Sequence, residues 1–305
     1  MNNFIGKRRL PEMIHHQPSG LEEALDMLDM LNDLEGLVTP VAGCTDFIPG
    51  LRRGTLSFED GLHLVDLRRV DELYRIDIAN GRVRIGAAVT LSRILTSGLI
   101  RQHVPVLWEA VDDLASWQIR NTGTVGGNLC TASPAADTAP PLLVMDAQVV
   151  LQTKTESRKL PLAEFFLGPG KTILKEREIL TEIQLQAQSH GHRSKRIKLG
   201  RRSLFTLAIV SVAVLTRIMD NRFETVRIAF GSVAPTPLRA SKTEAFLTGR
   251  MVDRQTIEHA AELASKETRP IDDVRASSAY RKDMAEVLTR RALEICCSFN
   301  KEAQN

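Results

Sequence analysis

Several signals of common protein classes are missing from this chain of 305 residues. No apolar run approaches the roughly 20 residues that span a bilayer, and no apolar signal core follows the polar segment Met1 to Arg9. The four cysteines, Cys44, Cys130, Cys296 and Cys297, do not stand at the two-residue spacing of a zinc or iron–sulfur motif. We therefore expect a soluble cytoplasmic protein with reduced thiols and no metal of its own.

An excess of charge of one sign is also missing. The chain has 40 basic and 37 acidic residues, a net charge of +3, and the two signs are interspersed over most of its length. This balance does not favour a nucleic-acid partner. We interpret the densest basic stretch, Arg193 to Arg202, as a solvated connection and strand between two domains, in preference to a polyanion site. The chain has no Walker A motif and no G-x-G-x-x-G opening a helix.

The length allows two domains, and the apolar pattern changes near residue 190. Before this point the predicted elements are helices at 21–34, from 90 and at 104–114, strands at 38–42, 62–67, 147–152 and 178–185, and a hairpin at 74–87 with an Asn80-Gly81 turn. After it, strands at 207–216 and 226–232 precede helices at 253–266 and 278–296. That order indicates a separate α+β domain, so we predict domains at 1–190 and 191–305.

Two glycine loops carry the chemical signal. One is Ala42-Gly43-Cys44-Thr45-Asp46, directly after a predicted strand, and the other is Thr124-Val125-Gly126-Gly127-Asn128. The second lies in a polar stretch, Arg120 to Pro141, which we predict to be a long functional loop. Glycine lets backbone N–H groups converge on an anion without a lysine or arginine, and Thr45, Thr124 and Ser133 add hydroxyls. Alone, such loops are more often ordinary turns, so their spacing indicates only an anion-binding α/β protein.

Taken together, these segments resemble the FAD-binding subunits of molybdenum hydroxylases, a family that includes subunits of xanthine, carbon monoxide, nicotinate and aldehyde-type dehydrogenases. The resemblance rests on Ala42 to Asp46, on Ile119 to Asn128 and on Ala132-Ser133-Pro134-Ala135-Ala136-Asp137. It continues, in order and over nearly the whole chain, through segments 165–171, 178–180, 231–237 and 278–281.

The resemblance implies an α+β fold: a vanillyl-alcohol-oxidase-like (PCMH-type) FAD-binding domain of two α/β subdomains, followed by an antiparallel sheet with helices like the C-terminal domain of carbon monoxide dehydrogenase flavoproteins. It also implies cofactor-binding residues along an extended FAD. Those at the pyrophosphate and ribityl chain are Ala42, Gly43, Cys44, Thr45, Asp46, Thr124, Val125, Gly126, Gly127 and Asn128. Ser133 and Asp137 would lie further along, Ile179 and Leu180 would flank the ring system, and Lys198 would lie near its polar edge. No catalytic side chain is implied, and a helix N-cap is the alternative role for Asp137.

Cys44 departs from the family pattern, which has a second glycine at this position. If the position needs a positive φ, cysteine costs roughly 1 kcal/mol or more, which would weaken FAD binding or reshape the loop. A structural cysteine is the preferred interpretation, and a covalent cysteinyl flavin is the alternative. The chain also lacks the cysteine-rich insertion with which some relatives hold an additional four-iron cluster.

The function implied by the resemblance is electron transfer. Electrons from a molybdenum cofactor on a large partner subunit would pass through 2Fe–2S clusters on a small partner subunit to FAD, and then to NAD or another acceptor. Segments 166–171 and 234–237 favour a purine substrate of the xanthine dehydrogenase type. Two alternatives stay open: a stand-alone FAD oxidoreductase or maturation homologue, and a non-enzymatic anion- or nucleic-acid-binding protein that uses Arg193 to Arg202.

Overall fold

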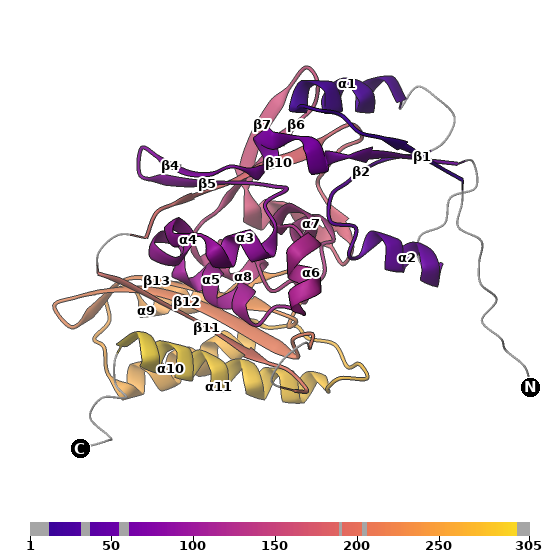
Figure 1. Ribbon diagram of the computed structural model, residues 1–305. Helices are drawn as coiled ribbons and strands as arrows, with labels where there is room; N and C mark the ends of the chain where they lie inside the picture. Colours follow the sequence, from indigo (N-terminus) through magenta and orange to yellow (C-terminus); the bar gives the residue numbers. More distant parts are fainter. Residues whose placement is uncertain (1–11, 32–36, 55–60, 189–190, 203–205, 298–305) are drawn as a thin grey trace, which may run out of the picture.

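The structure is a computed structural model that describes residues 12–31, 37–54, 61–188, 191–202 and 206–297. Its elements form a small sheet at one end, a larger sheet beside a group of short helices, and a second layered unit below them (Figure 1). No helix among the described residues is long and apolar enough to cross a membrane. The predicted boundary at residue 190 and the end of the helix predicted at 21–34 lie outside the described residues.

The N-terminal sheet has three parallel strands in the order β1 (Met13–His16), β3 (Leu62–Asp66), β2 (Leu37–Val41). Helix α1 (Leu21–Leu31) packs Ala24, Leu25 and Leu28 against one face, in a cluster with Val65. Leu62 and Leu64, at alternate positions of β3, instead join the cluster that holds α2 (Phe47–Arg53). The predicted strands at 38–42 and 62–67 are therefore confirmed, and the loop after β2 runs directly into α2.

The second sheet has five antiparallel strands, whose order is β4 (Ile76–Ala79), β5 (Arg82–Gly86), β10 (Ile179–Gln186), β6 (Gln148–Gln152), β7 (Ser157–Pro161). The predicted hairpin is β4–β5, and its turn residues Asn80 and Gly81 have φ of 52° and 72°. Both values are positive, as a type I′ turn requires. A small hairpin of β8 (Phe166–Gly168) and β9 (Lys171–Thr172) follows β7.

The stretch from Arg120 to Pro141 is not the long loop that its composition predicted. It is part of a layer of short helices, which are α3 (Leu91–Thr96), α4 (Gly98–His103), α5 (Pro105–Asp112), α6 (Trp117–Thr122), α7 (Val125–Cys130) and α8 (Ala139–Val144). The Thr124 hydroxyl accepts a hydrogen bond from the Gly127 N–H and caps α7, while Val125 and Leu129 are fully buried. Helices α3, α4 and α7 bury only one or two large apolar residues each, too few to produce a visible helical period in the sequence. Short 3-10 helices lie at Leu67–Arg69, Asp71–Tyr74 and Leu162–Glu164.

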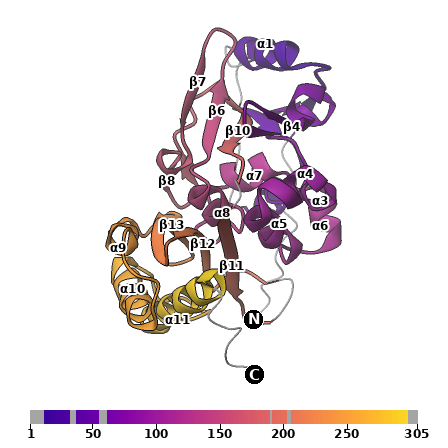
Figure 2. The same cartoon turned by 90° about the vertical axis from the view of Figure 1, so that its left-hand side faces the viewer.

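The C-terminal part is an antiparallel sheet of four strands in the order β11 (His192–Leu199), β12 (Val210–Met219), β13 (Arg222–Gly231), β14 (Leu238–Arg239). Helices α9 (Ser241–Leu247), α10 (Arg254–Glu267) and α11 (Ser278–Cys297) cover its outer face (Figure 2). Val212 and Val214 of β12 pack toward these helices, whereas Ala213 and Leu215 join the core of the N-terminal part. This two-sided burial explains the apolar run from Val212 to Leu215 in β12. The predicted order of strands before helices is confirmed.

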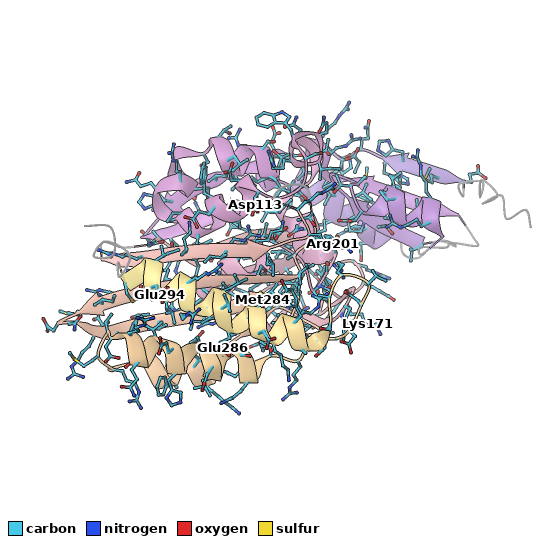
Figure 3. All side chains as sticks on the ribbon, turned by 90° about the horizontal axis from the view of Figure 1, so that it is seen from below. Asp113, Lys171, Arg201, Met284, Glu286 and Glu294 are labelled. Atoms are coloured by element: carbon cyan, nitrogen blue, oxygen red, sulfur yellow. The ribbon has the colours of Figure 1, made fainter. Side chains whose placement is uncertain are left out.

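The basic stretch Arg193 to Arg202 was predicted to be a solvated connection and strand, and the structure agrees only in part. Residues 193–199 belong to strand β11, and Arg193, Arg201 and Arg202 are exposed. The prediction is wrong for Arg196 and Lys198, which are almost completely buried because β11 packs against the helices of the N-terminal part. Their charges are paired with carboxylates, as described below. In the view from below, α11 lies on one side of this sheet and the helical layer that contains Asp113 lies on the other (Figure 3).

Candidate functional site

A cleft of about 940 Å³ lies where the loop after β2 meets the helical layer. Its volume is at the upper end of the range for small-molecule and cofactor sites. Ten of the fifteen predicted cofactor residues line it, and these are Ala42, Gly43, Cys44, Thr45, Asp46, Thr124, Gly127, Asn128, Ser133 and Asp137. Three sequence segments that are separated by up to 95 residues are thus brought to one surface.

The loop from Ala42 to Asp46 presents backbone donors to this cleft. Within the described residues, the N–H groups of Gly43, Cys44, Thr45 and Asp46 make no hydrogen bond to the protein. Cys44 has a φ of 53°, which turns the chain in the left-handed region and makes adjacent N–H groups converge. Such a concave group of free donors fits an anion such as the diphosphate of a dinucleotide.

Gly43 is required by the protein's own packing. A Cβ atom at this position would lie 2.1 Å from the Thr122 carbonyl oxygen, because the loop approaches the end of α6 closely. A second contact joins the same two regions: the Thr131 hydroxyl donates to the Asp46 carboxylate over 3.3 Å. The loop is therefore positioned by the opposite wall of the cleft.

The second glycine loop uses its backbone differently. The N–H groups of Val125 and Gly126 donate to carbonyl oxygens of Val89 and Ala87, and those of Gly127 and Asn128 donate to Thr124. A Cβ atom on Gly126 would lie 2.6 Å from that of Ala87, so this glycine permits close packing of α7 on the end of β5. This loop lines the cleft with the surface of Gly127, which has no side chain, and with the side chains of Thr124 and Asn128. The side-chain amide oxygen of Asn128 accepts a hydrogen bond from the Thr138 hydroxyl.

Asp137 lies at the cleft with only 7% of its side chain exposed, and its carboxylate is held by two cations. Arg196 Nη2 lies 2.5 Å from Oδ1, and Lys198 Nζ lies 2.9 Å from Oδ2. Burial raises the pKa of Asp137, and the charges of Arg196 and Lys198 oppose that rise. The alternative role as a helix N-cap is not found, because Thr138 occupies the cap position of α8.

The other five predicted residues do not line the cleft. Val125 and Gly126 are buried behind it, Ile179 and Leu180 are 2% and 4% exposed within two hydrophobic clusters, and Lys198 reaches it only through Asp137. The roles proposed for all fifteen residues stay predictions.

The cleft also has walls formed by residues that were not among the predicted cofactor residues. Leu114, Ile119 and Leu207 supply apolar surface suited to a flat ring, and Ile119 and Leu207 are 40% and 59% exposed. Arg53, at the end of α2, is the one cation among the described residues that line it. Of these residues only Ile119 belongs to a motif, as the first residue of the segment 119–128. Arg53, Leu114 and Leu207 come from the end of α2, the segment after α5 and the segment before β12, which only the tertiary structure brings together.

Cys44 lies half-buried in this site, and burial raises the pKa of its thiol above the usual range. The guanidinium of Arg68 opposes that rise, while the buried carboxylate of Asp66 adds to it. Asp66 itself is held by Arg68 and by His15, whose Nε2 lies 2.9 Å from it. Burial alone would raise the pKa of Asp66, but these hydrogen bonds together outweigh it and lower the pKa to about 2. The thiol is therefore protonated at neutral pH, which favours a structural cysteine over a nucleophilic one.

Two family models match the chain in succession. The FAD-binding domain in molybdopterin dehydrogenase matches residues 11–185, and the carbon monoxide dehydrogenase flavoprotein C-terminal domain matches residues 195–295. The xanthine dehydrogenase FAD-binding subunit of Escherichia coli O157:H7 is 30% identical over 92% of this chain and 94% of its own length. The carbon monoxide dehydrogenase medium chain of Hydrogenophaga pseudoflava is 31% identical over 93% of this chain and 96% of its own length.

Solved structures agree with these matches. A carbon monoxide dehydrogenase chain from Hydrogenophaga pseudoflava superposes with a TM-score of 0.89 at 30% identity, covering 95% of this chain and 99% of that one. A chain of quinoline 2-oxidoreductase from Pseudomonas putida 86 gives 0.87 at 26% identity, over 95% and 98% of the two chains.

Proposed function

Because this chain belongs to the family of FAD-binding subunits of molybdenum hydroxylases, we propose that it transfers electrons through FAD within a heteromeric complex of the xanthine dehydrogenase type. Its partners would be a large subunit with the molybdenum cofactor and a small subunit with 2Fe–2S clusters. Relatives named as medium chains of such dehydrogenases support this arrangement.

The observation that carries the proposal is the meeting of both glycine loops with Ser133 and Asp137 at one cleft. The free N–H groups of Gly43 to Asp46 would hold the diphosphate, and the uncovered side of Gly127 lets the cofactor approach α7. When bound, FAD supplies the chemistry that accepts and releases electrons singly or as hydride. The protein's own groups bind and orient it, and no side chain is needed as a general base.

The electron acceptor and the substrate are the finer parts of the proposal. We propose NAD as the first acceptor to test, because nicotinamide can dock over a flavin without a fingerprint of its own. We propose a purine as the first substrate class, on the basis of segments 166–171 and 234–237. Overall identity does not separate the classes, since xanthine, glyceraldehyde and carbon monoxide dehydrogenase subunits match at 29% to 31%.

The visible spectrum of the purified chain tests the first part. A yellow protein that releases FAD on acid treatment supports the proposal, and a colourless chain that cannot be reconstituted with FAD contradicts it. Co-purification with a large and a small subunit then separates the complex from a stand-alone flavoprotein. The anion-binding alternative loses part of its support, because two of its cations, Arg196 and Lys198, are buried and paired and are therefore not available to a polyanion.

A further inference from the structure

The C-terminal part of the chain reaches the cofactor cleft through a group of four charges, three of which are buried. Arg196 and Lys198, at alternate positions of β11, lie with side chains 2% and 4% exposed against Asp137 and Asp113 of the N-terminal part. Arg196 Nη1 lies 2.5 Å from Asp113 Oδ1 while Nη2 lies 2.5 Å from Asp137 Oδ1. One guanidinium thus joins the carboxylate at the cleft to a second carboxylate at the end of α5.

This arrangement is poorly explained by stability alone. The Nε atom of Arg196 is buried and has no hydrogen-bond partner among the described residues, which costs free energy. Buried ion pairs are often replaceable by apolar side chains without loss of stability, because desolvation offsets the attraction between the charges. The effect of Arg196 on Asp137 is therefore a better explanation for this buried cation.

The carboxylate of Asp137, which lines the cleft, keeps acceptor capacity beyond its two contacts with cations. Each of its oxygens has two lone pairs, and Arg196 and Lys198 each bind one oxygen. An ionised carboxylate at this place can accept hydrogen bonds from hydroxyl or N–H groups of a bound dinucleotide. A protonated one would lose charge and acceptor strength, so the neighbours that keep it ionised determine how it binds.

We propose that Arg196 is a positioning residue that holds Asp137 ionised and oriented toward the FAD cleft, so that the C-terminal domain contributes to cofactor binding without touching the cofactor. The proposal rests on the cofactor site assigned above. The charged groups that face Asp137 are Arg196 and Lys198 of β11 and Asp113 after α5. Removal of Arg196 leaves one cation against two carboxylates and raises the pKa of Asp137.

The test measures the dissociation constant of FAD for the full chain between about pH 5 and pH 9. In Arg196→Gln, Asp137 takes up a proton at a higher pH than in the wild type. The pH at which FAD affinity is half lost should therefore rise by about one to three pH units. Lys195→Gln is the matched control, because it removes an ion pair between β11 and Glu109 of α5, over 3.1 Å, without contacting Asp137. Its pH profile should be that of the wild type.

Two further variants separate the ways in which the proposal can fail. Asp137→Asn should bind FAD more weakly and without this titration. If it binds FAD as the wild type does, Asp137 is outside the site and the proposal falls with the assignment. If Asp137→Asn loses affinity while Arg196→Gln keeps the profile of Lys195→Gln, the site stands and the positioning role is wrong.

Arg196→Lys covers the case in which Arg196→Gln does not fold. Lysine keeps the charge beside Asp137 but cannot bridge Asp137 and Asp113 with two nitrogens of one planar group. FAD affinity should therefore fall by less than about tenfold, and the pH at which half of it is lost, the midpoint, should not change. A midpoint that rises in Arg196→Lys, although the positive charge is retained, would overturn the proposal.

Discussion

The loops Ala42–Asp46 and Thr124–Asn128 face the same cleft, but the first leaves four N–H groups without protein acceptors among the described residues, whereas Val125 to Asn128 in the second all donate within the protein. The glycines of the two loops also have different structural roles. Gly43 and Gly126 permit contacts between protein segments, and Gly127 leaves room on the cleft side. The comparison teaches that a glycine-rich loop identifies a close approach, but that its hydrogen bonds decide whether it binds an anion or builds the wall behind one.

The largest effect is expected from Gly43→Ala. The new Cβ atom would lie 2.1 Å from the Thr122 carbonyl oxygen, so the loop must move away from α6. We expect a loss of about 3 kcal/mol in the free energy of unfolding, measured in urea, together with loss of FAD. Gly98→Ala is the control, because nothing lies within 4 Å of a Cβ atom there. Wild-type stability of Gly43→Ala would show that the loop is not held by α6.

Gly127→Val tests the open side of the second loop. Its Cβ atom would meet only the Thr124 hydroxyl, 2.9 Å away, and the added methyl groups would occupy the cleft. FAD affinity should fall by about a hundredfold, close to 3 kcal/mol, while the circular dichroism of the C-terminal domain is retained. Gly126→Ala should do the reverse, lowering stability by about 2 kcal/mol through the contact with Ala87. Normal retention of FAD by Gly127→Val would show that the pyrophosphate does not bind beside this loop.

Arg53→Gln tests whether the free backbone N–H groups are sufficient to bind the diphosphate of FAD. Arg53 is the cation that lines the cleft, and Arg52 beside it does not. A charge-assisted contact with phosphate predicts about tenfold weaker FAD binding in Arg53→Gln and a flatter dependence on salt, measured by fluorescence titration. Arg52→Gln should bind FAD normally. Equal affinities and salt slopes in the two variants would assign diphosphate binding to the backbone alone.

The smallest effect is expected from Cys44→Gly. Cys44 holds a φ of 53°, which costs an L-residue about 1 kcal/mol and costs glycine little. FAD affinity or the free energy of unfolding should therefore increase by up to about 1 kcal/mol, a factor of about five in the corresponding equilibrium constant. If both decrease, the thiol makes a contact that outweighs the backbone strain.

Much of the fold follows from local patterns. The Asn80-Gly81 turn, the strands around it and the long C-terminal helices were predicted correctly, because the spacing of apolar residues and the residue types of turns can be recognised within a few neighbouring positions. The helices between Arg120 and Pro141 were missed, since each is short and is stabilised by contacts with distant segments. The same limit applies to β11, whose charges suggested solvent until the structure placed their partners beside them.

The sequence by itself determined the family, the two glycine loops and the acidic residue that accompanies them, because their order and spacing are properties of the chain alone. Only the tertiary structure decided which backbone donors remain free, because hydrogen bonds such as that from Gly126 to Ala87 join residues 39 positions apart. It likewise decided that Arg196 supports Asp137, since a buried carboxylate takes its charge state from neighbours in space rather than in sequence.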